Sequence, residues 1–461
     1  MSFESDHQQC LEKLIWAMKE LQIDFEMPQI NKIADLIVQT MTGRWRSFHT
    51  PEHIFEVGGS DNAIELLAAL FHDVVYVQVD TSVNFNLSFY IAPFVKEVRD
   101  HLCIRDKDEL PTDQIFKIIL DLFGFAPSQT LSSFSGQNEF LSAVVGAKVL
   151  DPFLSTKQLV EIICCIETTI PFRPDNEQGV SAAEVLFGRL ENVNEKYSVG
   201  MSEEEMVDAI RRAVRLSNRD VGSFANPSPA RFLDGTWSLL PETNHNLHNS
   251  SSYTVAEYRQ ALQKMEGFMN FLKPDIIFQE FRGEPDRAIY ESLVDQSGHN
   301  LHVGRLYLGS KLFTIGFLEA ISRRLGRDIP VSSMMGELPS QGEDEVQSKL
   351  IDYIPEIDCL FSLKDEIEKE VLDLLEKGRY QNAAYDLKNS PLTTYIVKSI
   401  GFDSVREQCD RSKLFFRGEL TQEEFLEGIN PEITLTVLKG ITKLFEQRQA
   451  SLLKIMPVVS V

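Results

Sequence analysis

Three of the nine histidines in this chain fall between residues 48 and 76. His49 and His53 are four positions apart, and His72 is followed directly by Asp73. Imidazole nitrogens and carboxylate oxygens together are typical ligands of divalent metal ions. A single histidine is more often a hydrogen-bonded core or surface residue, but the clustering favours a metal site. The adjacent pair can serve one ion where the backbone turns both side chains toward it, as at a helix end.

A further ligand is expected from a later part of the chain. Catalytic metal sites usually keep three or four protein ligands and leave a position for water. Asp220 directly follows a long amphipathic helix predicted over residues 203–219. Taken alone it reads as a surface acid at a helix end. Asp220 is nevertheless a candidate for the further ligand, and both interpretations stay open at this point.

The elements that must position these residues are predicted to be helices. Apolar residues recur at intervals of three and four along most of the chain, and convincing alternating strands are absent. Capping and helix-breaking residues divide this pattern into segments. Besides stretches at residues 11–21 and 30–41, the predicted helices are 61–73, 86–102, 112–122, 138–150, 156–169, 181–193, 203–219, 254–272, 308–325, 344–353, 363–377, 379–389, 421–428 and 431–448. The predicted fold class is therefore all-α.

The length and the polar segments predict how the chain divides into domains. A chain of 461 residues is long for a single core, so two or three domains are expected. Turn-forming sequence fills residues 227–252, which we interpret as a linker or a loop over the active site. We predict a first domain over residues 1–226 and a second helical domain over 253–461. Within the second, Gly298 and Gly304 favour a loop rather than a continuous helix.

Composition narrows the classes of partner and compartment. The formal net charge of −24 argues against long nucleic acids, whose binding needs concentrated Lys and Arg. A small anionic substrate remains possible, because Arg44, Arg46 and Arg173 can neutralise one or two phosphates locally. No stretch approaches the ~20 apolar residues of a membrane span, and no secretory signal is evident at the N-terminus. With six cysteines that lack CxxC spacing, we expect a cytoplasmic protein that does not bind membranes.

The order His, then His-Asp, then a distant Asp in a helical setting resembles the HD superfamily of metal-dependent phosphohydrolases. Four segments carry this resemblance, and three of them are similar to a branch of predicted phosphohydrolases. They are Arg46-Ser47-Phe48-His49 with His53, Phe71 to Tyr76, the Asn138-Glu139-Phe140-Leu141-Ser142-Ala143 helix, and the helix from Leu159 to Thr169. The resemblance covers about residues 25–225 and implies an HD-like helical bundle. Nothing is recognised beyond it.

The resemblance also implies a role for each matching residue. The ligands that it implies for one divalent ion, such as Mn, Mg, Fe or Zn, are His53, His72, Asp73 and Asp220. It implies that His49 beside the ion donates a proton to the leaving oxygen. Arg46 would offset charge on the phosphoryl group, with a solvated arginine as the equally open alternative. For Glu139 we predict a role in orienting the nucleophilic water.

Two departures from the family pattern matter. Relatives with a second metal carry a histidine after the helix that contains Thr168, whereas this chain reads Ile170-Pro171-Phe172-Arg173 there. One metal is therefore favoured over two, and Glu167 with Thr168 is left open as a pocket lining. The second departure is an insertion over residues 77–137, which could cap the site or form a dimer surface.

We expect a phosphomonoesterase or phosphodiesterase that acts on a nucleotide or another small phosphoester. The alternative is a non-catalytic, HD-like regulatory or scaffold protein whose C-terminal helical domain binds a protein partner. A purely structural ion is disfavoured, because closed structural sites are commonly rich in cysteine. The sequence leaves the oligomeric state open, including a homo-oligomer.

Overall fold

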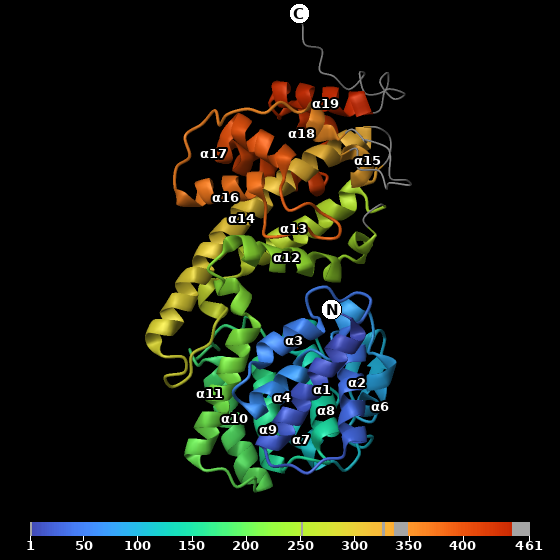
Figure 1. Ribbon diagram of the computed structural model, residues 1–461, viewed down its shortest axis with the longest axis vertical. Helices are drawn as coiled ribbons and strands as arrows, with labels where there is room; N and C mark the ends of the chain where they lie inside the picture. Colours follow the sequence, from blue (N-terminus) through green and yellow to red (C-terminus); the bar gives the residue numbers. More distant parts are fainter. Residues whose placement is uncertain (1, 250–251, 325–327, 336–348, 445–461) are drawn as a thin grey trace, which may run out of the picture. The chain divides into compact units, whose positions relative to one another are not determined.

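The computed structural model describes residues 2–249, 252–324, 328–335 and 349–444. Its regular structure is almost entirely α-helical, with a single pair of short antiparallel strands in this described part (Figure 1). The predicted all-α class is therefore confirmed. Among the helices of these residues, none is both long enough and apolar enough to cross a membrane.

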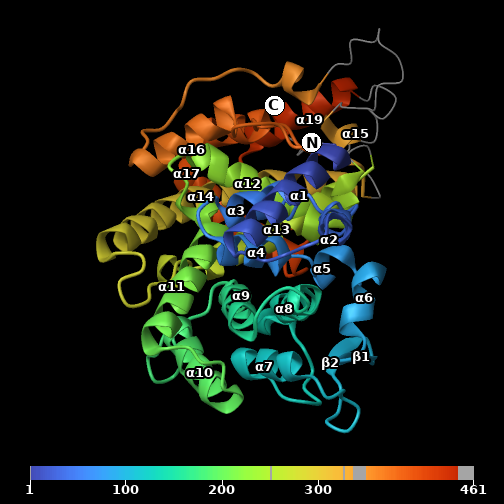
Figure 2. The same ribbon diagram turned by 60° about the horizontal axis from the view of Figure 1, so that its bottom comes forward.

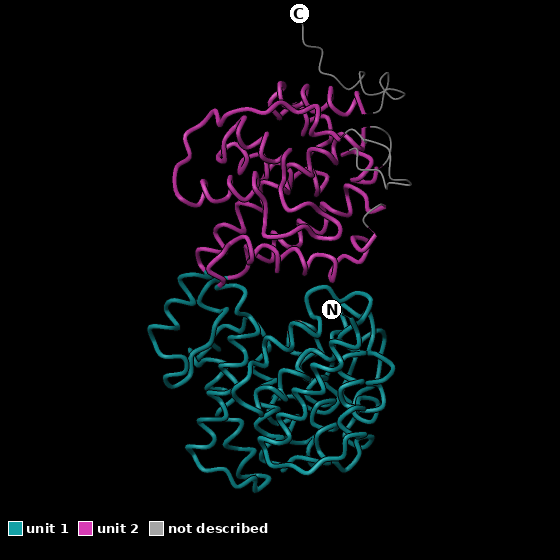
Figure 3. The backbone as a smooth tube through the Cα atoms, viewed as in Figure 1, with its two compact units in different colours: residues 1–225, 273–297 teal, residues 226–272, 298–461 magenta. Residues whose placement is uncertain are grey.

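The chain forms two compact units, and each unit is assembled from two separate segments of sequence (Figure 3). Unit 1 contains residues 1–225 and 273–297, and unit 2 contains residues 226–272 and 298–461. The first boundary thus lies next to the predicted limit at residue 226. The second segment of unit 1 was not expected, because the prediction gave everything after residue 252 to one domain.

Unit 1 is built around α4, whose ten residues are all buried. This helix packs against α1, α3, α8, α9 and α11, and the stretch Ala63–His72 is apolar on every side except at Glu65 and His72. Figure 2 shows α7, α8 and α9 lying side by side below it. The long helices of unit 1 are α1 (Phe3–Glu20), α2 (Met27–Met41), α3 (Pro51–Gly58), α4 (Ala63–His72), α8 (Gln137–Leu150), α9 (Thr156–Thr168), α10 (Ala182–Tyr197) and α11 (Glu203–Asp220).

The insertion over residues 77–137 contains a β-hairpin that was not predicted. The helix expected over 86–102 ends at Ile91, and the chain then forms β1 (Val95–Val98) and β2 (His101–Ile104). Arg99 and Asp100 form the two-residue turn with positive φ at both positions, a conformation that neither residue signals as clearly as Asn-Gly does. The other elements of the insertion are α5 (Val77–Asp80), α6 (Phe85–Ile91), α7 (Gln114–Phe123) and η1 (Ser133–Ser135), and α7 confirms the helix predicted over 112–122.

In unit 2, the segment expected to be a linker is helical instead. Pro229–Thr243 form α12, which begins with a proline in its first turn, and residues His245–His248 form the 3-10 helix η3. Phe232, Leu233, Trp237 and Leu240 give α12 a buried apolar stripe. Prolines and polar residues at both ends concealed this stripe, which is why the sequence suggested a linker.

Helix α14 (Arg287–Arg324) is continuous through both glycines that suggested a loop. A side chain at Gly304 would lie 3.0 Å from Phe232, so close packing explains this glycine better than a chain break does. The remaining elements are η4 (Pro274–Ile276) in unit 1 and, in unit 2, α13 (Val255–Phe271), α15 (Val331–Met335), η5 (Leu350–Tyr353), α16 (Glu366–Lys377), α17 (Pro391–Phe416), α18 (Gln422–Glu427) and α19 (Pro431–Leu444). Residues 325, 344–348 and 445–448 of three predicted helices lie outside the described part.

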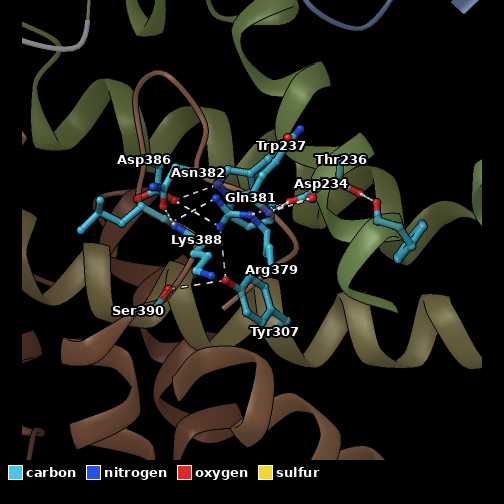
Figure 4. A network of polar contacts seen from close by, with 12 residues as sticks. Asp234, Thr236, Trp237, Tyr307, Arg379, Gln381, Asn382, Asp386, Lys388 and Ser390 are labelled. Carbon is cyan, nitrogen blue, oxygen red and sulfur yellow. Dashed lines mark hydrogen bonds and ion pairs between the residues drawn. The ribbon is translucent and has the colours of Figure 1, made fainter. Parts of the chain in front are cut away.

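The helix predicted over 379–389 is an irregular segment that a buried polar network holds in place (Figure 4). Asp386 Oδ2 accepts hydrogen bonds of 2.8 Å from Trp237 Nε1, Tyr258 OH and Lys311 Nζ. The Arg379 guanidinium lies 4.2 Å from the centroid of the Trp237 ring. Hydrogen bonds between side chains distant in the sequence thus stabilise residues 379–389 in place of the helical backbone hydrogen bonds that local propensity predicted.

Candidate metal centre

The four side chains predicted as metal ligands meet at the ends of helices in unit 1. His53 lies in α3, His72 is the last residue of α4, Asp73 is its C-cap, and Asp220 is the last residue of α11. One ligand atom from each of the four lies within 4.8 Å of the other three. Residues separated by 167 positions are thereby brought together, as the sequence predicted.

Nitrogen and oxygen atoms alternate around this centre. His53 Nε2 lies 3.0 Å from Asp220 Oδ1 and 3.5 Å from Asp73 Oδ2. His72 Nε2 lies 3.0 Å from Asp73 Oδ2 and 3.4 Å from Asp220 Oδ1. Two imidazoles and two carboxylates that converge in this way are a donor set suited to a divalent first-row ion.

The orientation of His72 supports a ligand role. Its Nδ1 lies 2.7 Å from the carbonyl oxygen of Ala69, to which a protonated Nδ1 donates. Nε2 then carries the lone pair and faces the centre, which is the tautomer that metal-binding histidines adopt. Nε2 is buried and has no partner with hydrogen-bond geometry among the described residues, despite the nearby carboxylates. The residues present therefore fit a bound cation.

Without a metal, opposite charges inside the centre stabilise one another. Burial alone would lower the pKa of His53, but its bonds to Asp220 and Asp73 and their charges raise the pKa to about 9. The same two carboxylates raise the pKa of His72 against its burial. Burial likewise opposes ionisation of Asp220, yet the charge of His72 and the bond from His53 lower its pKa to about 2. The centre holds its carboxylates ionised, as metal binding requires.

A buried ion cluster positions the end of α11 that carries Asp220. Glu65, the one charged residue of α4, is 3% exposed and accepts bonds from Arg215 and Arg219 at 2.8 and 2.7 Å. Arg219 also donates to the carbonyl oxygen of Val57 in α3 at 2.7 Å. The residue before Asp220 thus ties α11 to both helices that supply the histidines. An acid within an apolar helix and two arginines four residues apart were signals that the sequence interpretation missed.

Arg46 does not take the role predicted for it. Its side chain is fully buried, and its guanidinium binds both carboxylate oxygens of Asp80, at 3.1 and 2.7 Å. It also donates to the carbonyl oxygens of Asp73, at 2.7 Å, and Val74, at 3.4 Å. A guanidinium with these partners is committed to holding the turn after α4. The structure therefore corrects both earlier interpretations, a phosphoryl-binding arginine and a solvated one, to a residue that positions Asp73.

The predicted Asn-Glu helix, α8, borders the same turn. Asn138 Oδ1 accepts a bond from the backbone N–H of Val77, and Ser142 Oγ accepts one from Val75, each at 3.1 Å. Between them lies Glu139, whose Oε2 is buried and has no hydrogen-bond partner in the described part of the chain. Burial raises the pKa of Glu139 to about 7, its own backbone opposes the shift, and the charges of Asp73 and Asp220 add to it.

His49 also lies close to the centre. Its ring centroid is 5.6 Å from that of His53 and 4.5 Å from that of Tyr76. After His72, the charge of His49 contributes most among nearby residues to lowering the pKa of Asp73 against its burial. The predicted proton donor is thus beside the ligand set, and its role in catalysis stays a prediction.

Gln279 reaches this region from the second segment of unit 1. Its Nε2 donates 3.0 Å bonds to the carbonyl oxygen of Thr168 and to Ser217 Oγ. Its backbone N–H and carbonyl oxygen both bond to the side chain of Asn218, at 2.8 and 2.9 Å. No pattern in the sequence signals this contact, because it depends on the chain returning to unit 1.

We expect the metal-free protein to lose stability as the pH rises from 6.5 to about 9. With a pKa of about 9 when folded and about 6.5 when unfolded, His53 binds more protons in the folded state over this interval. Its stabilisation is complete below pH 6.5 and is lost as the pH rises through its folded pKa, a loss of about 3 kcal/mol. Urea denaturation with chelator at several pH values measures this effect. An unfolding free energy that stays constant over the interval would contradict it.

Fold and site together agree with the features that the resemblance to HD phosphohydrolases predicts, namely a helical bundle and four convergent ligands. Membership of that family, which would concern residues about 25–225, stays a prediction. Searches of protein-family models, of curated proteins and of solved structures gave no match to this chain.

Proposed function

We propose that this protein is a metal-dependent phosphohydrolase of the HD type that acts on a nucleotide or another small phosphoester. The observation that carries the proposal is the convergence of His53, His72, Asp73 and Asp220, in which the buried His72 Nε2 faces both carboxylates without hydrogen-bond geometry to either. A bound divalent ion supplies Lewis-acid activation of water and of a phosphoryl oxygen. We propose a divalent ion, either a first-row transition metal or one like magnesium, and specify its identity no further.

The residues around the ligand set can move the protons that hydrolysis requires. Glu139, with a pKa of about 7, exchanges a proton readily near neutral pH and has a free carboxylate oxygen to accept one from the attacking water. His49, whose ring centroid lies 5.6 Å from that of His53, donates a proton to the leaving oxygen. Arg46 keeps Asp73 in place from outside the centre. In this assignment two residues act on the substrate and one only positions a ligand.

The test is hydrolysis by chelator-treated full-length protein to which Mn, Mg, Fe(II) or Zn is returned. We expect release of nitrophenol from a nitrophenyl phosphate monoester or diester, and of phosphate from members of a nucleotide panel. Asp73→Asn should reduce the rate at least about 100-fold, because it removes a ligand whose carboxylate must be charged. Asp108→Asn, an exposed aspartate of the insertion, is the matched control and should keep the wild-type rate.

Absence of hydrolysis with every metal, although the protein binds one, would overturn the proposal. It would favour the regulatory alternative, in which the same bundle serves as a frame. If Asp73→Asn hydrolyses the substrates at the wild-type rate, the activity belongs to a contaminating protein in the preparation.

A further inference from the structure

The end of α9 and the segment after it contact two helices that border the metal centre, α8 and α11. Its residue Ile170 packs directly on Gly136, the N-cap of α8, where a side chain would collide with Ile170. At the end of α9, Gln279 joins the carbonyl oxygen of Thr168 to Ser217, three residues before Asp220. Thr168 is thus linked to the last turn of α11, and Ile170 packs at the start of α8, the helix that carries Glu139.

Arg173 is held in this segment by a buried carboxylate. Glu167 is 1% exposed and binds Nη1 and Nη2 of Arg173 at 2.7 and 3.1 Å, and its carbonyl oxygen accepts from Nη2 at 3.2 Å. These bonds use three of the five guanidinium N–H donors. Nε is buried and has no partner among the described residues, while the side chain as a whole is 25% exposed. Arg173 is thus fixed in orientation and still reachable from solvent.

The charges around Glu167 do not balance. Arg189 Nη1 lies 3.5 Å from the same oxygen, Oε1, that Arg173 binds, so two guanidinium groups share one carboxylate. Glu167 alone therefore balances only one of the two guanidinium groups. Arg173 and Glu139 also act on one another, because Arg173 opposes the rise in the pKa of Glu139, and Glu139 helps to raise the pKa of Arg173.

No comparable cation is provided by the other two arginines that the sequence suggested for phosphate. Arg46 is buried against Asp80, and Arg44 is exposed with its guanidinium 4.5 Å from the centroid of the Trp45 ring. Arg173 combines a fixed orientation, spare donors and a carboxylate partner that it shares with Arg189. Oriented guanidinium groups bind phosphate oxygens through charge-assisted hydrogen bonds.

We propose that Arg173 binds the phosphate of the substrate and that the preferred substrates are dianionic phosphate monoesters rather than diesters. This inference rests on the proposed function. A divalent ion is neutralised by the two aspartates of the ligand set, so the Arg173 guanidinium, which shares Glu167 with Arg189, is the group left to offset a second negative charge on the phosphate. A diester carries only one negative charge and forfeits that attraction.

Binding of inorganic phosphate tests the inference separately from catalysis. Calorimetric titration of the metal-loaded full-length protein with phosphate should show about tenfold to 100-fold weaker binding for Arg173→Gln, since a hydrogen bond to a charged group is lost. Metal content should stay at the wild-type level. Arg212→Gln is the matched control. Arg212 of α11 pairs at 3.0 Å with Glu161, which lies in α9 as Glu167 does, and this variant should leave phosphate binding unchanged.

A double variant separates loss of binding from loss of folding. Arg173→Gln alone leaves Glu167 with only its distant bond to Arg189, so Glu167→Gln with Arg173→Gln removes both charges of the pair. We expect the double variant to bind phosphate as weakly as the single one while it melts like the wild type. Phosphate binding equal to the wild type in either folded variant overturns the inference.

Kinetics decide the substrate class. Wild-type protein should give a higher kcat/KM for a nitrophenyl monoester than for the bis-nitrophenyl diester, and Arg173→Gln should raise KM for the monoester much more than for the diester. Equal losses for both esters, or a wild-type preference for the diester, would overturn the assignment of monoesters. Phosphate binding that depends on Arg173 without any hydrolysis would refute the proposed function and keep the anion site.

Discussion

Replacing Asp220 by alanine is expected to lower the affinity for a divalent ion at least about 100-fold and to abolish metal-dependent hydrolysis. Losing a residue that merely supports a ligand already costs about 10- to 100-fold in affinity. Asp220 contributes more, because its Oδ1 lies within 3.4 Å of both imidazole nitrogens and its charge opposes that of the ion. Metal content measured after dialysis, and calorimetric titration of chelator-treated protein, give the two readings.

The control for this prediction lies on the same helix. Asp208 in α11 has a half-exposed side chain that pairs only with Arg211, three residues on, among the ion pairs of the described chain. Asp208→Ala should keep close to one ion per chain. Retention of that ion by Asp220→Ala would contradict the ligand set and leave Asp220 as a helix-end acid.

Arg46→Met is expected to lower the free energy of unfolding of unit 1 by about 3–5 kcal/mol. Methionine fills part of the volume but leaves Asp80 without its cation and the carbonyl oxygens of Asp73 and Val74 without their donor. Removing one partner of a buried pair is costly because the other charge stays behind, and the 16% exposure of Asp80 places the effect toward the lower value. Denaturant titration with chelator measures the loss.

Two further variants make this second prediction specific. Arg44→Met removes an exposed arginine beside Trp45 and should cost less than about 1 kcal/mol. In Arg46→Met, hydrogen exchange should accelerate first at the backbone amides of residues 73–80, next to the lost contacts. Unfolding free energies that are equal for the two arginine variants would show that Arg46 is not committed to the turn after α4.

Much of the fold was predictable where apolar periodicity was strong and unbroken. The helix expected over 203–219 is α11, and the one expected over 156–169 is α9. The prediction failed where local chemistry is ambiguous. Helix α17 (Pro391–Phe416) was missed, because Gly401 inside it has non-helical backbone angles and interrupts the apolar spacing. The segment over 379–389 has helical propensity, yet bonds to Asp386 hold it irregular.

His72 and Asp73 were predictable as candidate ligands because they lie within one short motif, whereas Asp220, nearly 150 residues later, was predicted from the resemblance to a family. His72 and Asp73 are adjacent, and the end of α4 places both at one point, so little tertiary information was needed. The functions of arginines were less predictable. Arg46 and Arg173 look alike in sequence, and only the position of a neighbouring acid, Asp80 for one and Glu167 for the other, determines which is committed and which has donors to spare.

The return of residues 273–297 to unit 1 has a consequence for synthesis on the ribosome. When residue 225 has left the ribosomal exit tunnel, every proposed ligand is outside it. The residues of this later segment that bond to α11 are not yet outside. Arg215 still awaits Glu284, which it binds at 2.7 Å, and Asn218 awaits Gln279. Unit 1 thus reaches its final form only after residues 273–297 have been translated, so its folding must wait until residues 226–272 of unit 2 have been made.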